Sequence, residues 1–125
     1  MNRRNQREKS VLCIYAYLCL ARDINTIIED TFACPIADID PYFINVIKKA
    51  VTNFNEYKKY IDRVLDNWSF ERLGTIEKAI LLVGCAEFSL QEVAAAIIID
   101  EAVELAKKYG EADSYRLINN VLDVI

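Results

Sequence analysis

Apolar residues recur every three or four positions along most of the chain, which is the spacing of helices that bury one face. In the first helix, predicted over residues 3–22, these positions are Val11, Ile14, Tyr15 and Leu18. Asn25 is expected to cap a short second helix that ends near Phe32, and residues 33–38, which contain Pro35, form the clearest loop.

Asp40 and Pro41 are the residue types favoured as an N-cap and a first helical residue. They predict a third helix that stops near Asn53, with an inner face of Ile44, Ile47, Val51 and Phe54. Asn55 is expected to cap the next helix, where the buried spacing continues through Tyr57, Ile61, Val64 and Trp68.

The next helix, with Thr75 as its expected cap, is apolar almost all round over residues 79–86 and therefore belongs at the centre of a bundle. Residues 93–109 predict another helix, whose inward residues are Ile99, Ala102, Val103 and Ala106. Gly110 follows at the position that commonly takes positive φ. Asp113 should cap a final helix with Leu117, Val121 and Ile125 on one stripe, so the predicted fold class is all-α.

Composition agrees with one helical domain over residues 1–125. The chain has only 3 glycines and 2 prolines, and with 54% hydrophobic residues it has enough apolar side chains for a core that needs no disulfide or metal. Its four cysteines form no CxxC pair, and we interpret them as buried, reduced thiols of a cytoplasmic protein rather than as a disulfide framework.

Charge is unevenly distributed. Residues 1–9 contain Arg3, Arg4, Arg7 and Lys9 against Glu8 alone, a local +3, and subtracting it from the net −4 leaves −7 on the rest. Arg3 and Arg7 lie one helical turn apart, so both guanidinium groups are expected to engage successive phosphates. The alternative is a solvated helix start. Without interleaved Trp, Phe or Leu, this arm suits RNA better than a membrane.

The basic residues followed by the apolar run 11–21 also imitate a signal peptide, although the helical spacing and the two tyrosines in the run favour a core helix.

The chain contains no histidine, which makes catalytic or zinc sites hard to build. We expect Asp100, Glu101 and Glu104 to form salt bridges with Lys107 and Lys108 rather than bind a metal. Tyr15 and Trp68 are expected in the core rather than as RNA-stacking platforms.

Three C-terminal segments carry a resemblance to a known family. They are WSFERLGTIEKAIL (68–81), IDEAVELAKKYG (99–110) and DSYRLINNVLD (113–123). In order, spacing and polarity they resemble the NusB family of transcription antitermination factors. The arginine-rich start and Tyr15 fit the same family, so the resemblance covers essentially the whole chain.

The resemblance implies about seven helices in two small bundles and a non-enzymatic, cytoplasmic protein with neither cofactor nor metal. NusB proteins bind boxA RNA of ribosomal RNA transcripts together with the ribosomal protein NusE, and the pair joins the RNA polymerase antitermination complex. The family includes monomers and dimers, so a homodimer is one of two expected states. The positions that match RNA-binding places of the family are Arg3, Arg4, Arg7, Tyr15, Lys78 and Asp113, and Glu77 matches a place near the protein partner.

Several positions depart from the family pattern. Leu82 replaces an arginine, Asn120 the glycine of an Asn-Gly pair and Ala94 a proline, so weaker RNA binding is expected. The alternative function is therefore a helical interaction or dimerisation module that has lost RNA binding. A second alternative is the NusB-like domain that precedes some RNA methyltransferase domains.

Overall fold

The computed structural model describes residues 1–66 and 68–125, and within these ranges it contains α-helices and two short 3₁₀ turns but no strand. The all-α prediction is therefore confirmed. The helices are α1 (Arg3–Cys19), α2 (Ile24–Phe32), α3 (Pro41–Thr52), α4 (Phe54–Val64), α5 (Thr75–Leu90), α6 (Ala95–Tyr109) and α7 (Ser114–Val124), with 3₁₀ turns η1 (Ile36–Asp38) and η2 (Phe70–Arg72).

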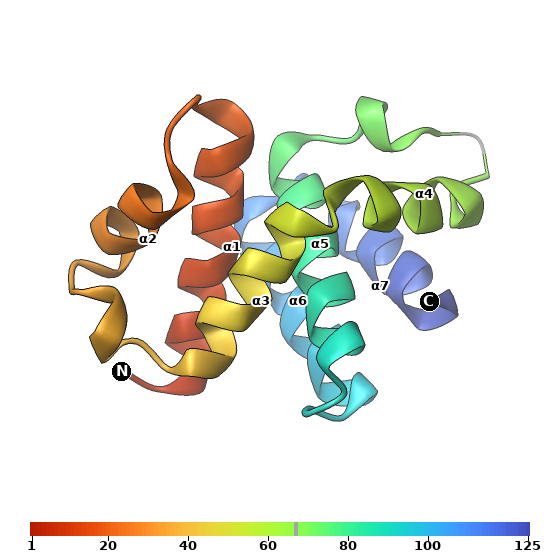
Figure 1. Ribbon diagram of the computed structural model, residues 1–125. Helices are drawn as coiled ribbons and strands as arrows, with labels where there is room; N and C mark the ends of the chain where they lie inside the picture. Colours follow the sequence, from red (N-terminus) through yellow and green to blue (C-terminus); the bar gives the residue numbers. More distant parts are fainter. Residues whose placement is uncertain (67) are drawn as a thin grey trace.

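Helix α5 is the centre of the fold, as its all-round apolar sequence predicts. Every residue from Ala79 to Glu87 is buried, and α5 packs against α1, α3, α4, α6 and α7. Figure 1 shows α1, α2 and the start of α3 on one side of α5, with α4 and α7 on the other. The N-terminal and C-terminal helices thus form two small groups that share one central helix.

The predicted start of α3 agrees with the structure. The Asp40 carboxylate accepts a hydrogen bond from the Tyr42 backbone N–H at 2.9 Å, and Pro41 is the first residue of α3, as predicted. The predicted caps Asn25, Asn55 and Thr75 are wrong. Helices α2, α4 and α5 begin one or two residues earlier, and their N-caps are Asp23, Asn53 and Gly74.

Gly110 does not take the predicted positive φ, because its φ is −91°. Glycine is needed at position 110 for another reason: a Cβ there would lie 2.7 Å from the Ser114 Cβ and 2.8 Å from the Ala106 carbonyl oxygen. The described residues with positive φ are Ala33 and Gln91, each following a helix. Close approach between the end of α6 and the start of α7 therefore excludes a side chain at Gly110.

The inner faces of two helices are rotated by about one residue from the prediction. In α3 the buried residues include Phe43 and Val46, whereas Ile44 and Val51 are half-buried. In α6 the buried residues are Ile98, Ala102, Leu105 and Ala106, so the prediction is confirmed for Ala102 and Ala106, whereas Ile99 and Val103 are half-buried. The spacing alone does not identify the fully buried stripe, because neighbouring positions on both helices are also apolar.

Three residues predicted on buried stripes lie at the surface, and Tyr15 is one of them. Helix α4 ends at Val64, so Trp68 lies outside it and is 58% exposed, and Ile125 at the end of α7 is 43% exposed.

The four cysteines are unpaired, but only Cys13 and Cys85 are buried. Burial raises the pKa of Cys13 to about 11 and that of Cys85 to about 12. Cys19 is exposed and Cys34 half-buried, so the buried-thiol prediction is wrong for them.

Helix α1 packs into the core through Val11, Cys13 and Ile14, which confirms the predicted stripe for Val11 and Ile14, whereas Leu18 is half-buried. Within the described ranges, no helix is both long and apolar enough to cross a bilayer.

Candidate nucleic-acid interface

The first turn of α1 presents two arginines to solvent. The Arg3 side chain is 54% exposed, and its guanidinium stacks over the Tyr42 ring at 4.6 Å from the centroid and lies 3.8 Å from an Asp40 carboxylate oxygen. The Arg4 side chain is 74% exposed, and its Nε donates to Glu101 at 3.2 Å. Both guanidinium groups retain N–H donors that face solvent, which is the arrangement that bidentate phosphate binding requires.

Arg7 does not share that surface, contrary to the prediction that it pairs with Arg3 on successive phosphates. Its side chain is only 6% exposed, and its Nε and Nη2 donate to the two carboxylate oxygens of Glu87 at 2.7 and 2.8 Å. Burial lowers the pKa of Arg7, but the hydrogen bond and charge of Glu87 outweigh it and raise the pKa overall. Lys9 also turns inward and donates to the Thr31 carbonyl oxygen. The solvent-facing arm is thus Arg3 and Arg4.

The sequence prediction missed Glu87 altogether. This carboxylate is 1% exposed in α5, and it accepts a third hydrogen bond from the Tyr42 hydroxyl at 2.7 Å. Burial and the bond to Glu87 raise the pKa of Tyr42. The signal in the sequence was a single acidic residue following the long apolar run of α5, which requires a buried cation as partner.

A surface network joins α1 to α6. Lys108 Nζ donates to Glu8 at 2.6 Å, and the Tyr109 hydroxyl donates to the same carboxylate. These two hydrogen bonds lower the pKa of Glu8. The predicted pair within α6 forms between Lys107 and Glu104 at 3.7 Å, but Lys108 pairs with α1 instead.

Farther along α1 lies a hollow of about 460 Å³ lined by Leu12, Tyr15, Thr75, Ile76 and Tyr109. Tyr15 is 40% exposed, so its prediction as a core residue is wrong. Arg4, Glu8, Leu12 and Tyr15 are three or four positions apart and follow one side of the helix. An exposed tyrosine ring on the same helix as two exposed arginines is suitable for stacking an unpaired base.

Glu77 and Asp113 line a second hollow, of about 540 Å³, together with Trp68 and Arg72. One Glu77 oxygen accepts from the Gly74 backbone N–H at 2.9 Å, and the other accepts from the Ser114 hydroxyl at 2.6 Å. Glu77 therefore ties the start of α5 to the start of α7. Asp113 is exposed at the N-cap of α7, and its carboxylate makes no capping hydrogen bond.

Lys78 lies beside η2. Its side chain is 19% exposed, lies 4.0 Å from Glu71 and is 5.5 Å from the centroid of the Phe70 ring. Both of those residues belong to η2. The structure thus groups Arg3, Arg4 and Tyr15 along α1, and Glu77 with Asp113, but places Lys78 beside η2.

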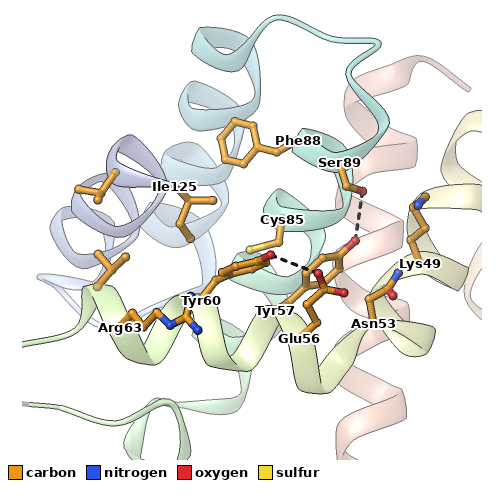
Figure 2. Close-up of a pocket in the computed structure, with 12 residues that line it drawn as sticks. Lys49, Asn53, Glu56, Tyr57, Tyr60, Arg63, Cys85, Phe88, Ser89 and Ile125 are labelled. Carbon is orange, nitrogen blue, oxygen red and sulfur yellow. Dashed lines mark hydrogen bonds between the residues drawn. The ribbon is translucent and has the colours of Figure 1, made fainter.

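A third hollow, of about 580 Å³, lies between α4, the end of α5 and the end of α7 (Figure 2). Its apolar wall includes Tyr57, Tyr60, Phe88 and Ile125. The Tyr57 hydroxyl lies 3.1 Å from the Ser89 hydroxyl, and the Tyr60 hydroxyl donates to Glu56 at 3.2 Å. The hollow has the size and lining to accept apolar side chains.

The departures from the family pattern have different consequences in the structure. Leu82 is fully buried, so the expectation that it removes a surface contact to RNA is wrong for this fold. Ala94 and Asn120 are exposed.

In the part of the chain that the structure describes, no group of three or more Cys, Asp or Glu side chains is arranged to hold a metal ion.

Comparison with known proteins gives one consistent result. The model of the NusB family matches residues 4–125. The chain is 36% identical over 125 residues to the transcription antitermination protein NusB of a Nitratiruptor species, covering 98% of this chain and 90% of that protein. It is 42% identical over 98 residues to the protein of the same name from Treponema denticola, covering 78% of this chain and 71% of that protein.

Solved structures show the same fold. The T. maritima NusB structure matches with a TM-score of 0.87 at 23% identity, covering 99% of this chain and 89% of that one. A chain in the crystal structure of antitermination factors NusB and NusE in complex with dsRNA matches with a TM-score of 0.85 at 23% identity, covering 98% and 93%.

Proposed function

The chain belongs to the NusB family, and from that premise we propose that it acts as a transcription antitermination factor. In this role it binds boxA-type RNA together with a NusE-type ribosomal protein, and the pair joins RNA polymerase during ribosomal RNA synthesis. The relatives named above are antitermination proteins, and one structural neighbour binds NusE and double-stranded RNA. The protein acts in the cytoplasm as one domain, through binding and without catalysing a chemical step.

The observation that carries the proposal is the pair of exposed arginines, Arg3 and Arg4, in the first turn of α1, with Tyr15 on the same side of the helix as Arg4. The two guanidinium groups face solvent at the helix start, and Tyr15 lies three turns farther along, in the hollow that it shares with Tyr109. Guanidinium groups supply phosphate contacts that fix position, and tyrosine rings supply stacking for bases. The combination favours single-stranded RNA as the ligand.

Asp113 and Glu77 take supporting roles. The Asp113 carboxylate, which makes no capping hydrogen bond within the chain, accepts a hydrogen bond from a base amino group or a 2′-hydroxyl of the RNA. This contact contributes specificity rather than affinity. Glu77 holds α5 and α7 together at the partner surface, because both of its oxygens already accept hydrogen bonds within the chain. Lys78 adds positive charge beside η2, and Arg7 supports α1 from within.

Electrophoretic mobility with boxA RNA, with and without the NusE-type partner, tests the proposal. We expect a retarded complex that the partner strengthens, and substantially weaker binding for the double variant Arg3→Ala, Arg4→Ala. Arg22→Ala is the matched control, because Arg22 is an exposed arginine just beyond the other end of α1 and pairs with Asp30. Absence of any complex, with or without the partner, would overturn the proposal and favour the interaction module that has lost RNA binding.

A second arm of the same experiment tests the stacking site. Tyr15→Ala should weaken RNA binding by about tenfold, within the range of one base stacked on an aromatic ring. Tyr60→Ala is the control, since Tyr60 is an equally exposed tyrosine in a different hollow. Equal effects of the two substitutions would show that the hollow beside Tyr15 does not hold a base.

A further inference from the structure

The start of α3 forms a platform beneath Arg3. The Arg3 guanidinium carbon lies 4.6 Å from the centroid of the Tyr42 ring and 5.3 Å from that of Phe43. The two rings meet edge to face, with centroids 4.9 Å apart and an interplanar angle of 88°. Arg3 therefore rests on an aromatic surface contributed by a helix that begins 38 positions farther along the chain.

The Tyr42 ring is itself locked in place. Its hydroxyl donates to Glu87 at 2.7 Å, and the same carboxylate holds Arg7 through two further hydrogen bonds. Asp40 fixes the backbone on the other side by capping α3, and the Asp40 backbone N–H donates to the Gln6 side chain at 3.1 Å. The ring cannot turn away without breaking a buried hydrogen bond to a charged group.

The platform orients Arg3 without occupying its donors. Among the described residues, the polar partner of the Arg3 guanidinium is Asp40 at 3.8 Å, which is beyond hydrogen-bond distance. A long side chain that is already held against a ring loses less conformational freedom when it binds a phosphate than one that moves freely in solvent. Arg4 has no such support, because its contact is a carboxylate on α6.

We propose that Tyr42 is a positioning residue for RNA binding: its ring orients the Arg3 guanidinium toward an RNA phosphate. This inference rests on the proposed function. It adds a buried residue of α3 to a site otherwise made from α1.

A double-mutant cycle on boxA RNA affinity, with the NusE-type partner present, tests the proposal. We expect Tyr42→Leu to weaken binding about threefold, the factor that corresponds to an exposed cation–π contact. That effect should disappear in the Arg3→Ala background and persist in the Arg4→Ala background, where the platform still has its arginine. Tyr42→Phe keeps the ring and loses the hydroxyl, so it should bind RNA as the wild type does.

The outcomes separate the two proposals. If the wild type does not bind boxA RNA, the proposed function fails and the positioning role fails with it. If it binds, and Tyr42→Leu weakens binding equally in both arginine backgrounds, only the positioning role is overturned.

Two measurements remain decisive if Tyr42→Leu does not fold. In NMR spectra of the wild-type protein, the ring current of Tyr42 should shift the Arg3 δ protons upfield relative to those of Arg4. Equal shifts would overturn the platform. Arg3→Lys keeps the charge but loses the flat stacking group, so it should bind RNA about threefold more weakly. Wild-type affinity for Arg3→Lys would also overturn it.

Discussion

Arginines one turn apart on α1 have opposite environments. Arg3 is 54% exposed on the surface of the helix start, whereas Arg7 is 6% exposed and bonded to Glu87 through two N–H groups. Their positions in the sequence are equivalent, because both lie in one cluster of basic residues on one helix. The difference shows that a residue's role in such a cluster depends on whether a packed helix buries it against a carboxylate.

Arg7 therefore has a different role in the protein from Arg3 and Arg4. Arg7 joins α1 to α5 in the interior, and its charge is neutralised by Glu87. Arg3 and Arg4 lie at the surface, where their ion pairs contribute little to stability and their donors face solvent. The buried and the exposed arginines can be tested separately.

Arg7→Ala should have the largest effect. It leaves the Glu87 carboxylate buried without its cation, and we expect the free energy of unfolding to fall by about 3–5 kcal/mol. Urea denaturation followed by circular dichroism measures this loss. Arg4→Ala is the control and should change stability by less than about 0.5 kcal/mol. Similar values for the two variants would contradict the contrast between the buried and exposed arginines.

Replacing the whole buried network by apolar residues should separate stability from RNA binding. The triple variant Arg7→Met, Glu87→Leu, Tyr42→Phe should recover to within about 1 kcal/mol of the wild type, because no charge remains buried. It should bind boxA RNA normally, since Arg3, Arg4 and an aromatic ring at position 42 all remain. A stable triple variant with lost RNA binding would show that the buried network contributes to RNA binding.

The salt dependence of RNA binding counts the arginines that reach phosphates. For the double variant Arg3→Ala, Arg4→Ala, the slope of log affinity against log salt should become shallower by about 1.4, at ~0.7 per phosphate on single-stranded RNA. The triple variant above should keep the wild-type slope. A slope shallower by about 0.7 in the triple variant would place Arg7 on the RNA as well.

Glu8→Gln should have the smallest effect and should depend on pH. Hydrogen bonds from Lys108 and Tyr109 lower the pKa of Glu8 in the folded state, so the carboxylate stabilises the fold at neutral pH. This advantage over Glu8→Gln should amount to less than about 1 kcal/mol, because it is a surface network. It should be lost as pH falls from about 4.5 through the folded pKa. A difference that persists at about pH 2 would show that the carboxylate charge is not its cause.

Several features of the fold and the site were readable from residue types and spacing. The all-round apolar stretch of α5 identified the central helix, and Asp40 with Pro41 identified the start of α3. These features depend on local chemistry, namely a side chain that caps its own helix or a segment with no polar face. The basic arm and the three family segments likewise identified the family before any tertiary contact was known.

Tertiary packing decided which of these residues reach solvent. Arg7 and Arg3 have the same intrinsic preferences, and only the approach of Glu87 from a segment 80 residues away separates them. Tyr15 and Trp68 fit the apolar spacing of buried stripes, yet both are exposed, because no neighbouring helix covers them. Periodicity specifies that a helix has an apolar side, whereas burial and charge pairing depend on contacts between segments that are distant in the sequence.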